Sequence, residues 1–492
     1  MDTDSAEFRE LFDVAFVEER AASDDYVGRD EIIEEVEEAL ADQSRRIVVL
    51  SGDPGTGKTT LMSALALRHP DWPRYFIRRA GERDLAAAKR GGHDGGLASF
   101  FTTVGLQLAA VRPDLFPEGP DDDLDIRLLI EHLGPGGSAQ ALRIERLLLH
   151  PFRRFAAQVR VSAGLVEGDL VGVYIGEFGE AALENPQALE IPALTVPLER
   201  LRLETPDERI VVLLDGLDEL RVRDAPSDVS RWLNEHAELH PNLRIVVASR
   251  KDDERLNTLS AIHADSLTSL NSSRKAAPDV TSYAGKVAAK PHVQRVLREY
   301  GVQPEEFARR AAAKADVVFQ YVAFLDRALA AAAREGPHPA DLDWLAAPTD
   351  EWPNGPGELY AKFMARIRDQ VKRVTLTAPA WDATYLPLLG LLAVAYAPLT
   401  TAQLAAYAGI SDEHATTCEG ALARLSQFVA GSPDDGYSLV HRSVAEYIVD
   451  PETAPSLGRA ESVAHQQITG YAFGRYGVDR AVDASHQPYA AL

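Results

Sequence analysis

The sequence Gly52-Asp53-Pro54-Gly55-Thr56-Gly57-Lys58-Thr59-Thr60 decides the fold of this chain. It has the form G-x-x-x-x-G-K-T and stands between the apolar run Arg46–Ser51, typical of a buried strand, and a helical pattern that ends near Arg68. Its glycines let backbone N–H groups converge on phosphates, and the helix N-terminus adds a partial positive charge. Lys58 is expected to reach the β- and γ-phosphates of ATP, or the β-phosphate of ADP, and the Thr59 hydroxyl is expected to bind Mg²⁺. The alternative, a glycine-rich turn that binds nothing, fits the surrounding strand and helix less well.

A second apolar run, Ile210–Leu214, ends in carboxylates at Asp215, Asp218 and Glu219. An acid at a strand end is common and by itself indicates only a strand terminus. Beside a phosphate-binding loop it supplies the second group that holds Mg²⁺, so Asp215 is expected to hold the ion, usually through water. Either Asp218 or Glu219 is expected to orient or deprotonate the attacking water. The two motifs together predict an ATPase and leave the choice of base open.

A third apolar run, Ile245–Ala248, leads to Arg250. Continuous apolar strands are what a parallel sheet covered on both faces requires, and its ligands bind beyond the carboxyl ends of the strands. Arg250 is therefore expected to point toward the γ-phosphate as a sensor. The alternative is an arginine that is simply solvated at the end of a strand.

The composition is that of an ordinary globular protein, with 492 residues, 46% hydrophobic residues and 26% charged residues, enough for two to four domains. The 51 Lys and Arg against 75 Asp and Glu give a net charge of −24, which argues against non-specific binding to nucleic acid. A single cysteine excludes a disulfide framework. The sequence shows no apolar run near the ~18 residues of a membrane span and no signal-like N-terminus. We therefore expect a cytoplasmic protein.

The rest of the chain suggests a series of domains. We expect helices over 8–16 and 30–40, a strand over 74–78, an irregular insertion over about 111–200 with one strand at 170–175, and mostly helical, alanine-rich sequence over 255–375. Pro379 and Pro398 bracket an apolar helix, and Thr400–Gln403 is a capping box that opens another helix.

Taken together, these motifs resemble those of NACHT-type STAND ATPases, a group of signalling proteins that includes innate-immune sensors. The resemblance rests on D-G-L-D-E at 215–219, on V-G-R at 27–29 and on the V-V-A-S-R strand end at 246–250, and it covers roughly residues 25–490. It is greatest for bacterial members that continue into WD40 or helical repeats. It implies an N-terminal helix and linker (1–24), a nucleotide-binding domain (25–255), a helical domain (256–375), a winged-helix domain (376–455) and the start of a C-terminal helical region (456–492).

The resemblance also implies site residues and a mode of action. Val27, Gly28 and Arg29 match the family's contacts to the nucleotide, and His441 matches the winged-helix histidine that touches the β-phosphate of ADP in the closed state. The winged helices are expected at 385–396, 399–408 and 412–428, and a wing strand at 437–440. The implied function is a signalling switch, closed with ADP and self-associating with ATP, with slow hydrolysis and a role in bacterial defence.

Two features depart from the family pattern. The stretch Lys314–Tyr321 lacks the Gly-Asn or Gly-x-Pro turn that often lines the adenine. The chain also contains no sensor repeat or effector domain, and it stops at Pro488–Leu492 in what resembles the start of a helix. We expect either a trimmed chain or a sensor that belongs to another chain, with the trigger and the effector unknown.

A different class of function is also open, an ATPase of replication or transcription control whose winged helix binds DNA. A helix that reads a groove needs Arg or Lys on its exposed face. The predicted helix 412–428 instead carries Asp412, Glu413 and Glu419 against Arg424. Its acidity disfavours DNA as a partner. A nucleotide-binding scaffold without turnover is the third possibility, and the intact lysine and acids argue against it.

Overall fold

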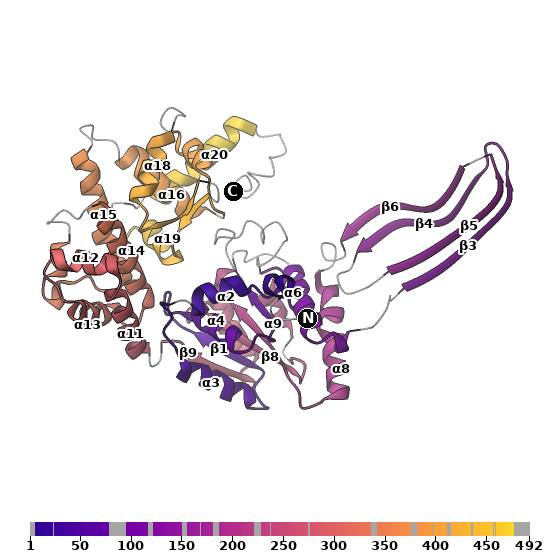
Figure 1. Cartoon of the computed structure of the whole chain (residues 1–492), viewed down its shortest axis with the longest axis horizontal. Coiled ribbons are helices and arrows are strands. Elements are labelled where there is room, and N and C mark those ends of the chain that lie inside the picture. Colours follow the sequence, from indigo (N-terminus) through magenta and orange to yellow (C-terminus); the bar gives the residue numbers. More distant parts are fainter. Residues whose placement is uncertain are drawn as a thin grey trace.

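The chain folds into a central α/β domain, a helical domain and a winged-helix domain, with a long β arm that projects from the first (Figure 1). The computed structural model describes residues 5–22, 24–77, 95–116, 122–149, 155–167, 169–180, 186–220, 228–236, 238–273, 276–335, 342–374, 381–395, 397–410, 415–433, 436–455, 457 and 459–476. No helix within these residues is both long and apolar enough to cross a membrane. Arg78, Pro379, Tyr396, Asp412, Glu413 and 488–492, which entered the sequence predictions, lie outside the described residues.

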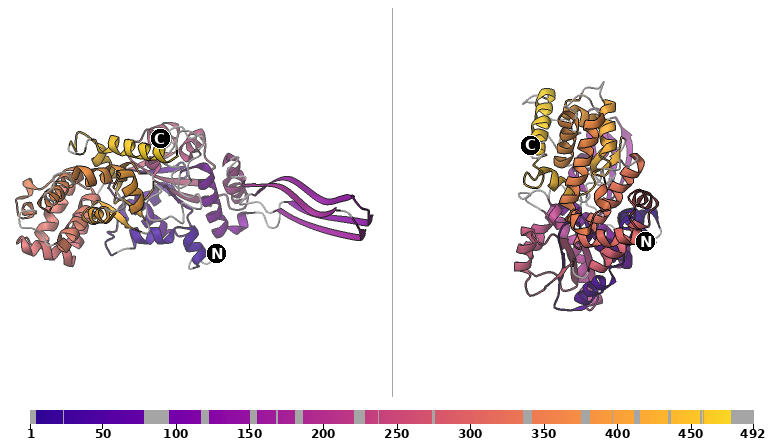
Figure 2. Two further views of the ribbon diagram at one scale, coloured as in Figure 1. Left: turned by 90° about the horizontal axis from the view of Figure 1, so that it is seen from above. Right: turned by 90° about the vertical axis from the view of Figure 1, so that its left-hand side faces the viewer.

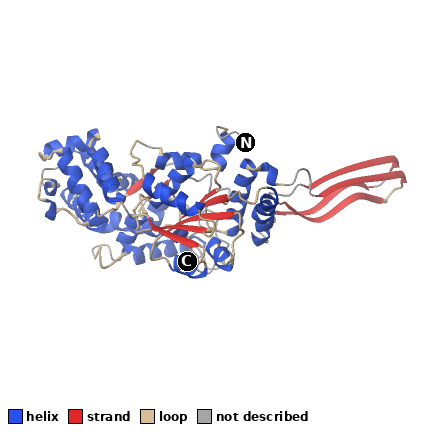
Figure 3. Cartoon of the chain, turned by 90° about the horizontal axis from the view of Figure 1, so that it is seen from below, coloured by secondary structure: helices blue, strands red, loops and turns tan. Residues whose placement is uncertain are grey.

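A parallel five-stranded sheet, drawn in red in Figure 3, forms the centre of the α/β domain. Its strand order is β2-β7-β8-β1-β9. Its strands are β1 (Ile47–Ser51), β2 (Arg74–Phe76), β7 (Ile210–Asp215), β8 (Leu243–Ser249) and β9 (Leu267–Asn271). The first four confirm the strands predicted from the apolar runs. Every residue of β7 and β8 is buried, because helices cover both faces of the sheet.

Alternate residues of β1 enter two different cores, one on each face of the sheet. Ile47 and Val49 pack with the helices α6 (Leu97–Val111), α8 (Val196–Glu204), α9 (Val229–Glu235) and α10 (Glu254–Ile262). Val48 and Leu50 pack with α2 (Val14–Ala21), α3 (Asp30–Ala41) and α4 (Lys58–Arg68). The sheet is thus held rigidly between two helical layers, and this fixes the position of the loops at its carboxyl edge.

One sequence prediction near this domain was wrong, and one strand was missed. The helix expected over 8–16 is two helices, α1 (Ala6–Leu11) and α2, because Asp13 between them adopts a left-handed backbone with φ 51°. The region 255–375 is mostly helical as expected, but within it β9 adds to the edge of the sheet beside β1. No residue of β9 is fully buried, and such a short, half-polar edge strand leaves little pattern in the sequence.

The insertion is not irregular as predicted but forms a β arm, visible in two perpendicular views (Figures 1 and 2). Its strands are β3 (Asp122–Leu133), β4 (Ser138–Leu149), β5 (Phe155–Val166) and β6 (Asp169–Glu180), with β3 parallel to β5 and β4 parallel to β6. The strand expected at 170–175 lies within β6, and residues 134–137 form the turn between β3 and β4. Every side chain of these strands whose exposure is described is at least partly exposed.

The remaining helices form the two C-terminal domains, which share one continuous apolar core. The helical domain contains α11 (Ala276–Ala288), α12 (Pro291–Glu299), α13 (Pro304–Ala315), α14 (Phe319–Glu335) and α15 (Gly355–Val374). The winged-helix domain contains α16 (Leu386–Val394), α17 (Thr401–Ala408), α18 (Ala415–Arg424), the hairpin β10 (Val429–Ser432) and β11 (Gly436–Leu439), α19 (Arg442–Val449) and α20 (Ala460–Tyr476). The capping box at Thr400 and Gln403 is confirmed.

Short 3₁₀ or π turns complete the described elements. They are η1 (Pro113–Leu115), η2 (Pro186–Leu189), η3 (Ile191–Thr195), η4 (Leu217–Glu219), η5 (Asp343–Leu345), η6 (Thr349–Glu351) and η7 (Trp381–Tyr385).

Candidate functional site

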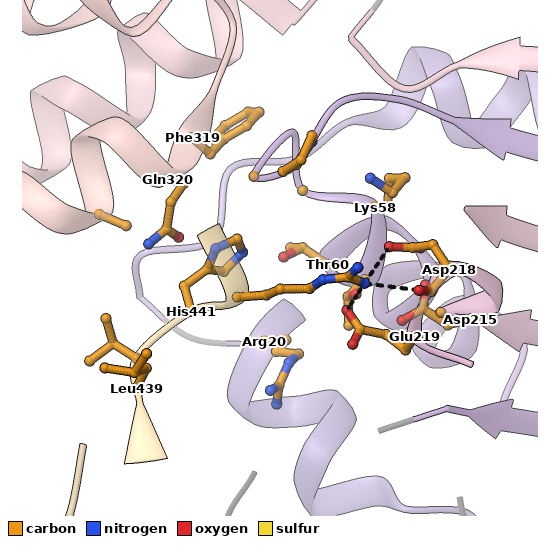
Figure 4. A pocket seen from close by; sticks show the side chains of 18 of the residues that line it. Arg20, Lys58, Thr60, Asp215, Asp218, Glu219, Phe319, Gln320, Leu439 and His441 are labelled. Carbon is orange, nitrogen blue, oxygen red and sulfur yellow. Dashed lines mark hydrogen bonds and ion pairs between the residues drawn. The ribbon is translucent and has the colours of Figure 1, made fainter. Parts of the chain in front are cut away.

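A pocket of about 560 Å³ lies at the carboxyl edge of the central sheet, where β1, β7 and β8 end (Figure 4). This volume lies within the usual range for small-molecule and cofactor sites. All three domains line it. The predicted site residues that it brings together are Val27, Arg29, Pro54, Gly55, Gly57, Lys58, Thr59, Thr60, Asp215, Asp218, Glu219, Arg250 and His441. Gly28, Gly52, Asp53 and Thr56 are not among its lining residues.

The loop between β1 and α4 has the backbone that its glycines predict. Gly55 and Gly57 have φ values of 77° and 81°, in the left-handed region that disfavours other residues. Gly52 is required for a different reason, since a Cβ there would lie 2.1 Å from the Ser272 hydroxyl oxygen. The loop is thus shaped by close packing on one side and open to the pocket on the other.

Lys58 lies across this loop and is only partly exposed. Its Nζ donates to the backbone oxygens of Gly52 at 2.9 Å and Asp53 at 3.0 Å. Burial lowers the pKa of Lys58, and the charges of Asp218 and Asp215 partly oppose that shift. The ammonium group is therefore held beside the loop by weak carbonyl partners, which the oxygens of a phosphate can replace.

Asp215 ends β7 at the floor of the pocket and is 4% exposed. Burial raises the pKa of its carboxyl group to about 7, with smaller contributions from Asp218 and Glu219, while a hydrogen bond from the Thr59 hydroxyl and the charge of Lys58 act in the opposite direction. A buried carboxylate paired with a hydroxyl offers oxygen ligands to a divalent cation. No cluster of three or more His, Cys, Asp or Glu side chains that could hold a metal occurs in the described part of the chain. Thr59 and Asp215 are the residues of this pocket that could hold Mg²⁺.

Arg250 follows β8 and joins two domains by ion pairs. Its Nε lies 2.9 Å from Asp218 Oδ2, and its Nη1 lies 2.6 Å from Oε1 of Glu446 on α19. Burial opposes the charge on Arg250, but the hydrogen bond and charge of Glu446, with the charges of Asp218 and Glu219, raise its pKa. Arg250 is therefore paired rather than solvated.

Arg442, also on α19, contacts the same acidic loop. Its Nη1 donates to the backbone oxygen of Asp218 at 2.9 Å and lies 3.3 Å from Asp218 Oδ2 and 3.5 Å from Glu219 Oε1. Its Nε lies 3.0 Å from Glu446 Oε1. Asp218, Glu219, Arg250, Arg442 and Glu446 thus form one charged network between the α/β domain and the winged helix.

His441 precedes α19 and reaches the pocket from the winged-helix side (Figure 4). Its Nδ1 caps α19 by accepting a hydrogen bond from the Ser443 backbone N–H at 3.1 Å, and it lies 2.7 Å from the Ser443 hydroxyl oxygen. Burial, followed by the positive charges of Arg250, Lys58 and Arg442, lowers the pKa of His441 to about 4. A backbone N–H can only donate, so the neutral ring carries its proton on Nε2.

Arg29 lines the pocket, but its side chain is bonded to the protein. Nη1 donates to the Thr56 backbone oxygen at 3.2 Å, Nη2 donates to the Ser272 backbone oxygen, and Nε lies 3.2 Å from Asp279 of α11. Arg29 therefore braces the phosphate-binding loop against β9 and the helical domain. Gly28 packs beside Asp30 instead.

Four lining or network residues were missed in the sequence: Phe319, Gln320, Arg442 and Glu446. Gln320 donates its backbone N–H to the Gly55 oxygen at 3.2 Å, and the Arg29 guanidinium carbon lies 5.5 Å from the centre of the Phe319 ring. The departure noted over 314–321 is thus a turn after all, in which Val317 takes a left-handed backbone with φ 64°. Its sequence carries no Gly or Pro, so nothing indicated it. Arg442 and Glu446 had a weak signal, an opposite-charge pair one helical turn apart beside His441.

Comparison with known proteins agrees with this geometry at the level of the ATPase domain. Residues 26–247 match a family model described as an AAA ATPase domain. No curated protein matches the chain.

Similar solved structures include Cdc6p from Pyrobaculum aerophilum (12% identity, TM-score 0.29, 93% of this chain and 97% of that one). A STAND protein with a tetratricopeptide repeat sensor from Pyrococcus horikoshii has 12% identity and a TM-score of 0.35, and covers 91% of this chain and 48% of that one. Drosophila ORC bound to DNA has 14% identity and a TM-score of 0.26, and covers 91% and 92%. With scores this low, the assignment depends on the family match and on the site itself.

The family match and the site define a P-loop ATPase. The AAA ATPase match spans the phosphate-binding loop, its lysine, the acidic strand end and most of the sheet. The parallel sheet, the helical domain and the winged-helix domain follow in the predicted order. The chain is therefore an ATPase with an α/β P-loop core. This assignment does not extend to the NACHT-type group that the sequence resembles.

Proposed function

We propose that this ATPase is a nucleotide-dependent switch, closed and monomeric with ADP, and open and self-associating with ATP. The observation that carries the proposal is that the winged helix supplies His441 to the pocket that the phosphate-binding loop forms. A nucleotide bound there would contact two domains at once. A ligand shifts a conformational equilibrium only through different contacts in the two states, and a nucleotide that contacts the winged helix in the closed state alone would meet this condition.

The α/β domain would hold the nucleotide itself. Backbone N–H groups of residues 52–60 would bind the phosphates, with Lys58 replacing its two carbonyl contacts by contacts to the β- and γ-phosphates. Thr59 and Asp215 would hold Mg²⁺, which supplies charge neutralisation at the phosphates when it is bound. Val27 and Phe319, which line the same pocket beside Arg29, would border the adenine base of the nucleotide.

The acids at the end of β7 would serve hydrolysis. Asp218 or Glu219 would accept a proton from the attacking water, and Arg250 would contact the γ-phosphate. Both acids and Arg250 line the pocket. The resemblance to NACHT-type proteins extends the proposal to slow turnover that resets a signalling switch, with self-association on activation and a role in bacterial defence.

His441 would act as the closing contact. With Nδ1 accepting from Ser443, the proton on Nε2 is free to be donated to an ADP phosphate oxygen. The low pKa of His441 keeps this tautomer neutral at physiological pH, so the contact is a directional hydrogen bond. It would tie the winged helix to the nucleotide in the closed state.

The nucleotide that co-purifies with the protein tests this proposal. Denatured protein is analysed by ion-exchange chromatography, and in parallel the native protein is sized with ADP and with a non-hydrolysable ATP analogue. ADP in the purified protein, with a monomer that self-associates only with the ATP analogue, is the expected result. An empty site, or the same size with both nucleotides, would contradict the switch. A salt-dependent DNA mobility shift would instead support the DNA-binding alternative.

A further inference from the structure

Helix α19 carries two opposite charges, and each pairs with an oppositely charged group of the hydrolysis site. Arg442 contacts the candidate bases, with Nη1 3.3 Å from Asp218 Oδ2 and 3.5 Å from Glu219 Oε1. Glu446 contacts the candidate sensor, with Oε1 2.6 Å from Arg250 Nη1. One face of one helix therefore pairs with both the acidic and the basic parts of the site.

These contacts compete with the chemistry expected of the same atoms. Asp218 Oδ2 lies within ion-pair distance of two guanidinium groups, Arg250 Nε at 2.9 Å and Arg442 Nη1 at 3.3 Å. The Asp218 side chain is only 9% exposed. A carboxylate oxygen that already pairs with two guanidinium groups is a poor acceptor for a proton from water, because protonation would weaken both ion pairs. The guanidinium group of Arg250 is likewise engaged, because its Nη1 pairs with Glu446 of the winged helix.

Stability of α19 alone does not explain the pair. An acid that precedes a base by four residues stabilises an isolated helix better than the reverse order, and here Arg442 precedes Glu446. The chain offers a comparison in Arg231 and Glu235 of α9, also four residues apart in this order, whose side chains are 56% and 45% exposed. The pair on α19 differs because it faces the ATPase site.

We propose that α19 is an inhibitory element, in which Arg442 masks the catalytic acids and Glu446 withdraws Arg250 until the winged helix moves away. This regulation rests on the proposed switch but is separate from the contact of His441 with the nucleotide. His441 retains ADP, whereas the charged pair restrains hydrolysis of ATP. Release of α19 would free the base and the sensor in one movement.

The test is steady-state ATP hydrolysis by the full chain, with ATP affinity and melting temperature measured on the same samples. Arg442→Gln should raise kcat at least tenfold, which corresponds to about 1.4 kcal/mol, with ATP affinity unchanged. Arg442→Lys keeps the charge and should raise it less. Glu446→Gln should also raise kcat, and it carries the test if Arg442→Gln does not fold. Arg231→Gln is the matched control and should leave kcat as in the wild type.

The double variant Arg442→Glu with Glu446→Arg separates inhibition from helix stability. It restores an ion pair within α19 but places Glu beside Asp218 and Arg beside Arg250, so kcat should stay raised. A return to the wild-type rate would overturn the proposal. So would an unchanged kcat in both single variants, or a fall in kcat at unchanged ATP affinity, which would make Arg442 catalytic. A wild-type protein that binds neither ATP nor ADP would instead refute the proposed switch.

Discussion

The α/β side and the winged-helix side of the pocket differ in the sequence signals of their residues. On the α/β side the lining residues come mainly from two motifs, the loop at 54–60 and the strand end at 215–219. On the winged-helix side residues 438–442, which include His441 and Arg442, carry no such motif and reach the pocket through the packing of a separate domain. This difference separates two tasks, since binding needs a preorganised local cradle and control needs a contact that can be broken.

Removal of the cation on the α/β side should have the largest effect. Lys58→Ala should abolish binding of both ATP and ADP, because the loop then faces several phosphate charges without its mobile ammonium group. Titration with a fluorescent nucleotide measures the affinity of the variant and of the wild type. Lys251→Ala, a neighbouring exposed lysine that pairs with Asp53, is the control and should retain binding. An unchanged nucleotide affinity in Lys58→Ala would show that this loop does not bind the phosphates.

Loss of the catalytic base should slow ATP hydrolysis and leave nucleotide binding unchanged. Asp218→Asn or Glu219→Gln keeps the shape of the side chain but cannot accept a proton, a loss of typically ~10²–10⁴ in rate. Asp218→Asn also weakens the ion pairs that Asp218 forms with Arg250 and Arg442. Any release of the winged helix that follows would raise the hydrolysis rate and partly offset the loss of the base. Single-turnover hydrolysis distinguishes the two acids. If neither variant slows it, the base lies elsewhere.

Removal of the histidine on the winged-helix side should have a smaller effect, on retention of the nucleotide. A hydrogen bond to a charged group contributes ~1.5–3 kcal/mol, so His441→Ala should shift the closed state toward the open one by roughly 10- to 150-fold. Stopped-flow release of fluorescent ADP should be faster, and the self-associated fraction larger, with the Lys58 cradle intact. A changed melting temperature with unchanged ADP release would make His441 purely structural.

The smallest expected effect is a pH-dependent change in stability at Asp215. Its carboxyl pKa is raised to about 7 from an ordinary value of 3.8, so the folded state favours the protonated form, and stability is lost as pH rises through 7. Asp215→Asn should therefore raise the melting temperature at pH 8 by a few degrees and by less at pH 5.

Differential scanning calorimetry without nucleotide or Mg²⁺ measures this difference. Asp252→Asn, at an exposed acid beyond the end of β8, is the control and should change neither value. An equal rise at both pH values would show that the charge of Asp215 is not the cause.

Much of the α/β side could be predicted from sequence because its signals are local. The apolar runs of β1, β7 and β8 and the glycines of the loop each act on neighbouring residues, and the strands appear where expected. The placement of His441 in the pocket was anticipated only through a family resemblance. Its role as the ADP contact stays a prediction.

The winged-helix side and the edges of the fold could not be predicted in the same way. The contact between Arg442 and Asp218 joins residues more than 200 positions apart, and no local pattern encodes it. β9 was missed because an edge strand with partly exposed residues lacks an apolar run. The β arm, apart from the strand expected at 170–175, was missed because its partly exposed strands lack a buried apolar run.

The central claim is that ADP and ATP place the winged helix differently, and a distance between the two domains tests it most directly. Cys418 is buried, so spin labels attach selectively to cysteines introduced at the exposed positions Asn257 of α10 and Glu419 of α18. Pulsed electron paramagnetic resonance should give a short distance between the two labels with ADP and a longer one with a non-hydrolysable ATP analogue. The same distance with both nucleotides, in protein shown to bind them, would contradict the account.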